Sequence, residues 1–110
     1  MKKYKKYNEV DDEGSIRYYN KKGKLNRKNG PAIEWKDGSK WWYKKGKLHR
    51  VDGPAVEYIN GYKIWYKKGK PHRIDGPACE WADGVKSYYI EGESFSKKEF
   101  DKIIKYYYNK

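Results

Sequence analysis

The 110-residue chain has few of the residues on which small domains usually depend. It contains one cysteine, Cys79, which excludes an intramolecular disulfide and removes any benefit of an oxidising compartment. Leucine occurs only at Leu25 and Leu48, so a hydrophobic core must be thin. No apolar run approaches the roughly 20 residues of a membrane span, and no signal peptide is recognisable. We therefore expect one soluble, cytoplasmic domain over residues 1–110.

Aromatic residues take the place of the missing aliphatic ones. Trp, Tyr and Phe make up 18% of the chain, with 13 Tyr and 5 Trp. A chain so poor in aliphatic residues and so rich in charge resembles disordered sequences in composition, but disordered sequences are also poor in aromatics. The aromatic content therefore favours a folded chain with a shallow core.

Basic residues outnumber acidic ones, which gives a formal net charge of +12. Arginine is scarce, so lysine carries most of this charge. A field of this sign attracts nucleic acids, anionic membranes and acidic protein surfaces at low ionic strength. The charge therefore indicates classes of partner, and it does not specify a fold.

Glycine spacing reveals an internal repeat. From Gly23 onward the glycines are 7, 8 and 8 residues apart, and the pattern recurs with a period of 23. At that period Tyr19, Trp42, Trp65 and Tyr88 share one position. Two motifs recur with it: Lys-Lys-Gly-Lys at 21–24, 44–47 and 67–70, and Gly-Pro-Ala at 30–32, 53–55 and 76–78. Such periods indicate units that must stack to bury a face, and we place three repeats and a partial fourth over residues 18–93.

Each repeat contains two short runs of aromatic and β-branched residues around an Asp-Gly or Asn-Gly pair. In the first repeat, Ala32–Trp35 and Lys40–Tyr43 flank Asp37-Gly38. This pattern predicts a β-hairpin with a type I′ turn, in which both central residues have positive φ. The predicted fold is mainly β, a single antiparallel meander of tandem β-hairpin repeats. The segment that links two hairpins carries turn signals, and the pattern leaves open whether it contains a strand.

Alternation along the strands sorts the side chains onto two faces. Ile33 and Trp35 point to one face and Glu34 to the other. The equivalent residues are Glu57 and Glu80. Each glutamate lies across its hairpin from a lysine, Lys40 for Glu34, and such a pair supports a sheet by ~0.2–1 kcal/mol. We interpret the carboxylates as structural. Aromatic residues occur on both faces, so the pattern does not tell which face is buried.

The two ends depart from the repeat. Ser96-Lys97-Lys98-Glu99 has the pattern of a capping box, which predicts a short helix over residues 96–108. An apolar stripe at helical spacing follows: Phe100, Ile103, Ile104 and Tyr107. We expect this helix to cap the open edge of the last hairpin. Residues 1–17, with Tyr4 and Tyr7, are predicted to form a degenerate strand region whose open edge favours dimers.

Two groups of residues suggest catalysis and are better explained by duplication. His49-Arg50-x-Asp52 recurs as His72-Arg73-x-Asp75, and we expect each His-Asp pair to hold its own Asp-Gly-Pro turn. A zinc site requires about four Cys or His ligands, and the chain has one Cys and two His. Cys79 aligns with Ile33 and Val56, which predicts a core position. We expect no enzyme, no metal site and no cofactor.

Residues 42–63, Trp-Tyr-Lys-Lys-Gly-Lys-Leu-His-Arg-Val-Asp-Gly-Pro-Ala-Val-Glu-Tyr-Ile-Asn-Gly-Tyr-Lys, resemble variant MORN-type repeats. They are similar to repeats of YwqK-like antitoxin-family proteins and of small phage and giant-virus proteins with tandem His-Arg-x-Asp-Gly-Pro-Ala units. The resemblance covers residues 18–93 and implies consecutive hairpins that end in a helix. It also implies a non-catalytic binding surface, and it suggests a phage-type, anti-CRISPR-like inhibitor of a bacterial defence complex. Asn26 and Asn29 replace the His and Asp of this motif in the first repeat, which indicates that those positions are dispensable for folding.

A surface of aromatic and basic side chains is the predicted functional site. We predict docking on a protein or nucleoprotein complex such as host defence machinery, because Trp and Tyr are enriched in binding hot spots and a positive rim steers acidic partners. Direct binding of single-stranded DNA or RNA is the alternative, with bases stacked on rings at roughly 1–3 kcal/mol each. An antitoxin role is a third hypothesis, and membrane docking ranks last. The predicted aromatic residues are Trp41, Trp42, Tyr43, Trp65, Tyr66 and Tyr88. The predicted basic residues are Lys44, Lys45, Lys47, Arg50, Lys67, Lys68, Lys70 and Arg73.

Overall fold

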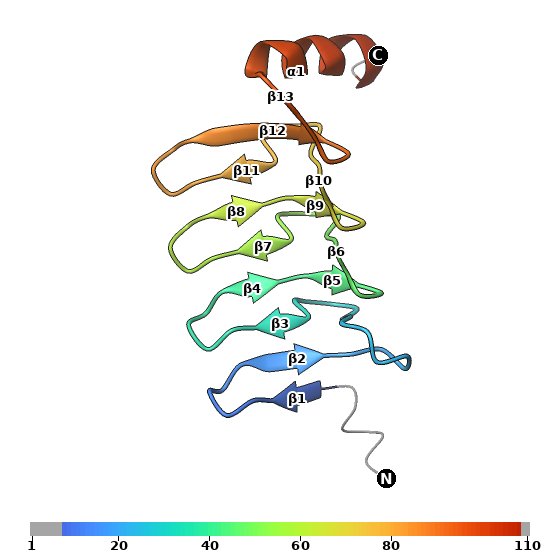
Figure 1. Ribbon diagram of the computed structural model, residues 1–110, viewed down its shortest axis with the longest axis vertical. Coiled ribbons are helices and arrows are strands. Elements are labelled where there is room, and N and C mark those ends of the chain that lie inside the picture. The colour runs from blue at the N-terminus through green and yellow to red at the C-terminus, as the bar shows by residue number, and fades with distance from the viewer. Residues whose placement is uncertain (1–7, 109–110) are drawn as a thin grey trace.

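Short strands stack along the long axis of the molecule (Figure 1). The computed structural model describes residues 8–108 and measures 54 × 29 × 18 Å. Nine strands form one antiparallel sheet in the order β1 (Asn8–Val10), β2 (Ile16–Tyr18), β3 (Ile33–Glu34), β4 (Lys40–Trp41), β7 (Val56–Glu57), β8 (Lys63–Ile64), β11 (Cys79–Glu80), β12 (Lys86–Ile90) and β13 (Glu93–Phe95). The predicted meander of hairpins is confirmed. Tyr4 and Tyr7 lie outside the described residues, and dimerisation through the β1 edge stays a prediction.

The hairpins form in the predicted register but with a different turn. The N–H of Gly38 donates to the carbonyl of Trp35 at 2.9 Å, and φ is positive at Gly38 (+98°) but not at Asp37. The turn is therefore a three-residue loop that ends in a left-handed glycine, and the type I′ prediction is wrong here. Asp37 is suited to this loop because its Oδ1 accepts from the N–H of Ser39 at 2.8 Å.

Type I′ geometry occurs instead at the connections after Tyr43 and Tyr66, whereas the first lysine-rich turn, Lys21-Lys22-Gly23, has positive φ at Gly23 alone. Two extra ribbons form there, β5 (Tyr43–Lys44) with β6 (Lys47–Leu48), and β9 (Tyr66–Lys67) with β10 (Lys70–Pro71). In the first ribbon φ is +52° at Lys45 and +83° at Gly46, the two residues of the loop. Lys68-Gly69 and Glu91-Gly92 repeat these angles. The linking segments therefore contain a short strand, a point that the sequence left open.

The core is a narrow column of small side chains. Ala32, Ala55 and Ala78 of the Gly-Pro-Ala motifs are 0% exposed. The N–H and the carbonyl of Ala55 bond to the two neighbouring strands at 2.8 and 2.7 Å. The residue that follows each alanine points to the other face and is also buried: Ile33, Val56 and Cys79. The core position predicted for Cys79 is therefore confirmed, and burial raises the pKa of its thiol.

A helix closes the C-terminal end of the array (Figure 1). Helix α1 (Lys97–Ile103) begins after Ser96, whose Oγ accepts from the N–H of Glu99 at 3.1 Å while Glu99 Oε1 accepts from the N–H of Ser96 at 2.8 Å. One π-helical turn, η2 (Ile104–Tyr108), follows. Phe100 is buried, but Tyr107 is 74% exposed because the wider π turn changes the angular spacing. The predicted helix is confirmed, and the predicted stripe is wrong at Tyr107.

Phe100 anchors this helix on the last long strand, with its ring centroid 4.9 Å from that of Tyr88. We expect Phe100→Ala to lower the free energy of unfolding by about 3 kcal/mol, through lost burial and the cavity left behind. Urea denaturation measures this change. Tyr107→Ala is the matched control and should shift the free energy by less than about 0.5 kcal/mol. Equal effects of the two changes would contradict the anchoring role.

Candidate functional site

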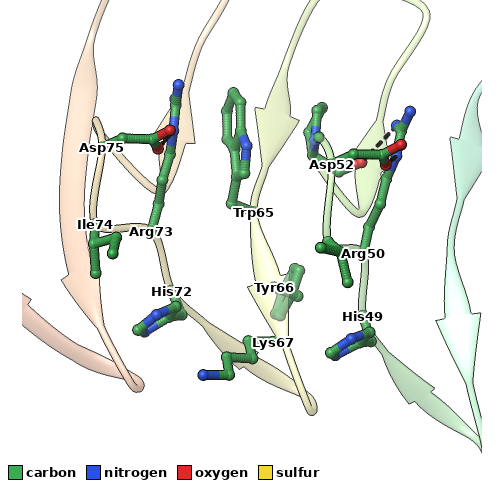
Figure 2. A pocket seen from close by; sticks show the side chains of 13 residues that line it. His49, Arg50, Asp52, Trp65, Tyr66, Lys67, His72, Arg73, Ile74 and Asp75 are labelled. Carbon is green, nitrogen blue, oxygen red and sulfur yellow. Dashed lines mark hydrogen bonds and ion pairs between the residues drawn. The ribbon is translucent and has the colours of Figure 1, made fainter.

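One face of the sheet, which we call the arginine face, carries a column of alternating rings and guanidinium groups. The Cζ atom of Arg50 lies 3.7 Å from the ring centroid of Trp42, and that of Arg73 lies 3.8 Å from the ring of Trp65. Figure 2 shows Trp65 standing between the loops that carry Arg50 and Arg73. Such contacts contribute about 0.5–2 kcal/mol, more as they are desolvated. The column therefore serves as a second layer of packing over the alanine core.

The first repeat is one residue out of step with the others in sequence. Arg27 lies 3.9 Å from the ring centroid of Tyr18, so Tyr18 occupies the place of Trp42. The N–H of Asn26 donates to the Tyr18 carbonyl as that of His49 donates to Trp42. The alignment of Tyr19 with Trp42 is therefore wrong, because the first turn, Lys21-Lys22-Gly23, has one residue more than the Lys45-Gly46 turn of the next repeat.

Each arginine also holds the loop that follows it. Arg50 Nε donates to Asp52 Oδ1 at 3.1 Å, and Arg50 Nη1 donates to the carbonyl of Pro54 at 3.0 Å and to Glu57 Oε2 at 3.2 Å. Arg73 makes the same three bonds one repeat later. The glutamates thus pair with arginines, although the predicted cross-strand register with the lysines is correct.

The histidines bind the next repeat and do not pair with the aspartates of their own loop. His49 Nδ1 accepts from the N–H of Lys68 at 3.0 Å, and His72 Nδ1 accepts from that of Glu91 at 2.8 Å. Asn26 Oδ1 accepts from the N–H of Lys45 in the same way at 2.8 Å. The predicted His-Asp pair is therefore wrong, and so is the prediction that position 26 is dispensable.

Accepting a hydrogen bond at Nδ1 requires the neutral imidazole. Burial lowers the pKa of both His49 and His72, and nearby lysines lower it further. The donors are the N–H groups of residues with positive φ, so each imidazole fixes the turn of the following repeat. The imidazoles are therefore structural hydrogen-bond acceptors between neighbouring repeats.

Exposed lysines gather at the Lys-Lys-Gly turns, which project from one long side of the molecule (Figure 1). The turns are stacked, because the N–H of Gly46 donates to the Leu25 carbonyl and that of Gly69 to the Leu48 carbonyl, both at 2.8 Å. The stem of Lys24 lies against Gly46, and that of Lys47 lies against Gly69. We call this surface the lysine edge; it consists of Lys21, Lys22, Lys24, Lys44, Lys45, Lys47, Lys67, Lys68 and Lys70. Within residues 8–108 none of these lysines forms an ion pair.

Grooves separate the successive His-Arg-x-Asp-Gly-Pro loops on the arginine face. One, of about 600 Å³, lies between residues 49–54 and 72–75 and contains Trp65 (Figure 2). Another, of about 880 Å³, lies between residues 26–30 and 49–52 and contains Trp42. The guanidinium groups beside these grooves are already paired with carboxylates, so they offer few free donors to a ligand.

The opposite face carries rings that pack on one another. The rings of Trp35 and Trp41 meet edge to face with centroids 5.1 Å apart. Tyr62 stacks on Tyr58 at 5.4 Å and on Trp81 at 4.8 Å. Four of these rings were not among the predicted site residues: Trp35, Tyr58, Tyr62 and Trp81. Alternation along the strands does place Trp35, Tyr58 and Trp81 on this face.

The predicted site residues therefore separate into three groups. Trp42, Trp65 and Tyr88 lie on the arginine face, whereas Trp41, Tyr43 and Tyr66 lie on the opposite face. The six predicted lysines all lie on the lysine edge. Arg50 and Arg73 are held inside the ring column. The structure thus brings the lysines together and divides the aromatic residues.

No family model, curated protein or solved structure matches the chain. The resemblance to MORN-type repeats and a phage origin therefore stay predictions. Across the described part of the chain, no group of three or more His, Cys, Asp or Glu side chains is placed to hold a metal. Over the same residues no helix has the length and apolar character needed to cross a bilayer.

We expect stability to fall as the pH drops through about 6.5. The folded-state pKa of each histidine lies below its ordinary value of 6.5, so the unfolded chain binds more protons in this window. Stability is therefore present above the unfolded pKa and is lost as the pH falls toward the folded pKa. Urea denaturation between about pH 7.5 and about pH 5 measures this change.

Asn26 accepts the equivalent hydrogen bond in the first repeat, and an asparagine therefore provides a matched control for the histidines. A His49→Asn, His72→Asn variant keeps the acceptors and should lose the histidine-dependent part of the pH profile. A His49→Ala, His72→Ala variant should lose about 1 kcal/mol per hydrogen bond at neutral pH. Equal stability of the two variants at neutral pH would contradict the acceptor role.

Arg73→Lys keeps the charge but removes the planar group over Trp65 and the Nε donor to Asp75. We expect the free energy of unfolding to fall by about 1–2 kcal/mol. Tryptophan fluorescence during urea denaturation measures the change, with Lys102→Arg as an exposed control. An unchanged midpoint for Arg73→Lys would mean that charge alone holds the column.

Proposed function

We propose that this protein is a non-enzymatic binding protein that docks on an anionic macromolecule through its lysine edge. The observation that supports this proposal is the stacking of the lysine-rich turns, which repeats exposed lysines along one side of the sheet. Within residues 8–108 these lysines have no ion-pair partner. A surface of one sign, combined with a net charge of +12, raises the encounter rate with an anionic partner.

The distribution of acidic side chains strengthens this proposal. Glu57 and Glu80 are turned toward Arg50 and Arg73, which neutralise them on the arginine face. These two carboxylates therefore pair with arginines and not with the lysines of the lysine edge. The exception is the last turn, where Glu91 and Glu93 stand at the positions of lysines in the preceding repeat. The positive surface thus extends over the first three turns and ends at the fourth.

The aromatic residues contribute less to this proposal than the sequence indicated. Trp42 and Trp65 each stack on a guanidinium, and the rings of the opposite face stack on one another. These ring–guanidinium and ring–ring contacts pack the sheet and leave the rings less available to a partner. Inhibition of a bacterial defence complex and an antitoxin role stay predictions that rest on the resemblance.

Heparin, a generic polyanion, tests the docking surface. We expect a Lys21→Gln, Lys44→Gln, Lys67→Gln variant to elute from a heparin column at clearly lower salt than the wild type. The matched control is Lys40→Gln, Lys63→Gln, Lys86→Gln, which removes the same charge from exposed lysines next to the opposite turns. Elution of both variants at the same salt would show that net charge alone determines binding, and it would overturn the proposal.

A further inference from the structure

We infer that the anionic macromolecule is a duplex nucleic acid, held by its phosphates along the lysine edge without readout of its bases. This inference rests on the proposed function and names its partner class. It differs from the single-stranded partner that the sequence suggested, because the structure separates the lysines from the aromatic rings.

The spacing of the lysine edge suits a regular polyanion. Successive turns are separated by two strand positions, or about 9.5 Å at the usual distance between strands. Three turns therefore span about 20 Å, over which a B-form duplex carries about 12 phosphates. Each of the three turns presents three exposed lysines, and a phosphate backbone is likewise periodic.

The chain has no free arginine with which to read base edges. Each of the four arginines is engaged by a carboxylate: Arg17 by Asp11, Arg27 by Glu34, Arg50 by Asp52 and Glu57, and Arg73 by Asp75 and Glu80. Arginine is the residue that most often recognises guanine in the major groove, whereas lysine serves as a point charge for phosphate. Contacts from the lysine edge thus position a duplex and carry no sequence information.

The rings also lack the arrangement that single-stranded nucleic acids require. Proteins of that class gain affinity by stacking bases on aromatic side chains within a basic groove. Here Trp42 and Trp65 stack on Arg50 and Arg73 on the arginine face, and Tyr62 is stacked between Tyr58 and Trp81 on the other. With phosphate contacts alone, affinity follows charge density, which is twice as high for a duplex as for one strand.

The last turn offers a gain-of-function test. Glu91 and Glu93 align with Lys68 and Lys70 at the 23-residue period, and φ at Glu91 is +50°, matching +51° at Lys68. A Glu91→Lys, Glu93→Lys variant would extend the lysine edge by one turn on an unchanged backbone. Tighter binding by this variant cannot be attributed to unfolding.

The experiment measures fluorescence anisotropy of a labelled DNA duplex of about 20 base pairs, and of one of its strands, over about 50–300 mM NaCl. We expect the wild type to bind the duplex more tightly than the strand and to bind a scrambled duplex equally well. The Lys21→Gln, Lys44→Gln, Lys67→Gln variant should lose at least about tenfold in affinity and reduce the salt slope by about 2–3. Glu91→Lys, Glu93→Lys should increase both, and Lys40→Gln, Lys63→Gln, Lys86→Gln should change them much less.

Several outcomes would overturn the inference. Tighter binding of the single strand, a strong preference for one sequence, or equal losses from the two lysine variants would each do so. Binding to heparin through the lysine edge without binding to duplex DNA would leave the proposed function standing, with an acidic protein as the partner. If the lysine-edge variant and the control variant eluted from heparin at the same salt, the proposed function would be overturned as well.

Discussion

Each repeat presents a backbone N–H that the preceding repeat must satisfy. The donor belongs to a residue in the left-handed region, Lys45, Lys68 or Glu91, where a side chain costs about 1–2 kcal/mol. Asn26 and His49 accept the first two of these bonds from one repeat below. Without the acceptor the turn would carry both backbone strain and an unpaired donor. The position of the lysine-rich turns, and hence of the lysine edge, depends on this bond.

The same dependence between neighbours explains how so thin a sheet is stable. The alanine column leaves no room for large side chains, so burial alone contributes little. Arginines on the arginine face replace a second apolar layer by stacking on Trp42 and Trp65 while they bind the next carboxylates. Each guanidinium thus joins a ring, a turn and a strand. Because these contacts recur with every repeat, stability grows by addition of similar units.

Local signals in the sequence predicted the hairpins and the helix, because the residues that determine them are neighbours in the chain. The Asp-Gly pairs and the Ser96–Glu99 capping box act within a few residues. The incorrect predictions concern contacts between residues of adjacent repeats. His49 meets the N–H of Lys68, 19 residues away, and a 23-residue period does not reveal which atoms of two copies touch. One extra residue in the Lys21-Lys22-Gly23 turn shifts the strand before it, and the equal spacing of the motifs after that turn does not reveal this shift. The site was predicted in part for the same reason: the lysines share one turn, whereas adjacent rings such as Trp41 and Trp42 point to opposite faces.

Phe100 occupies the place over Tyr88 that an arginine occupies over the ring of the two preceding repeats. A phenyl ring has no donors with which to bind a further loop or strand, so the chain of repeat-to-repeat contacts stops at this end. The helix therefore ends the array of repeats. Interior repeats are interchangeable in this arrangement, and a chain with one more copy before Tyr88 would lengthen the array by one unit and keep the same ending.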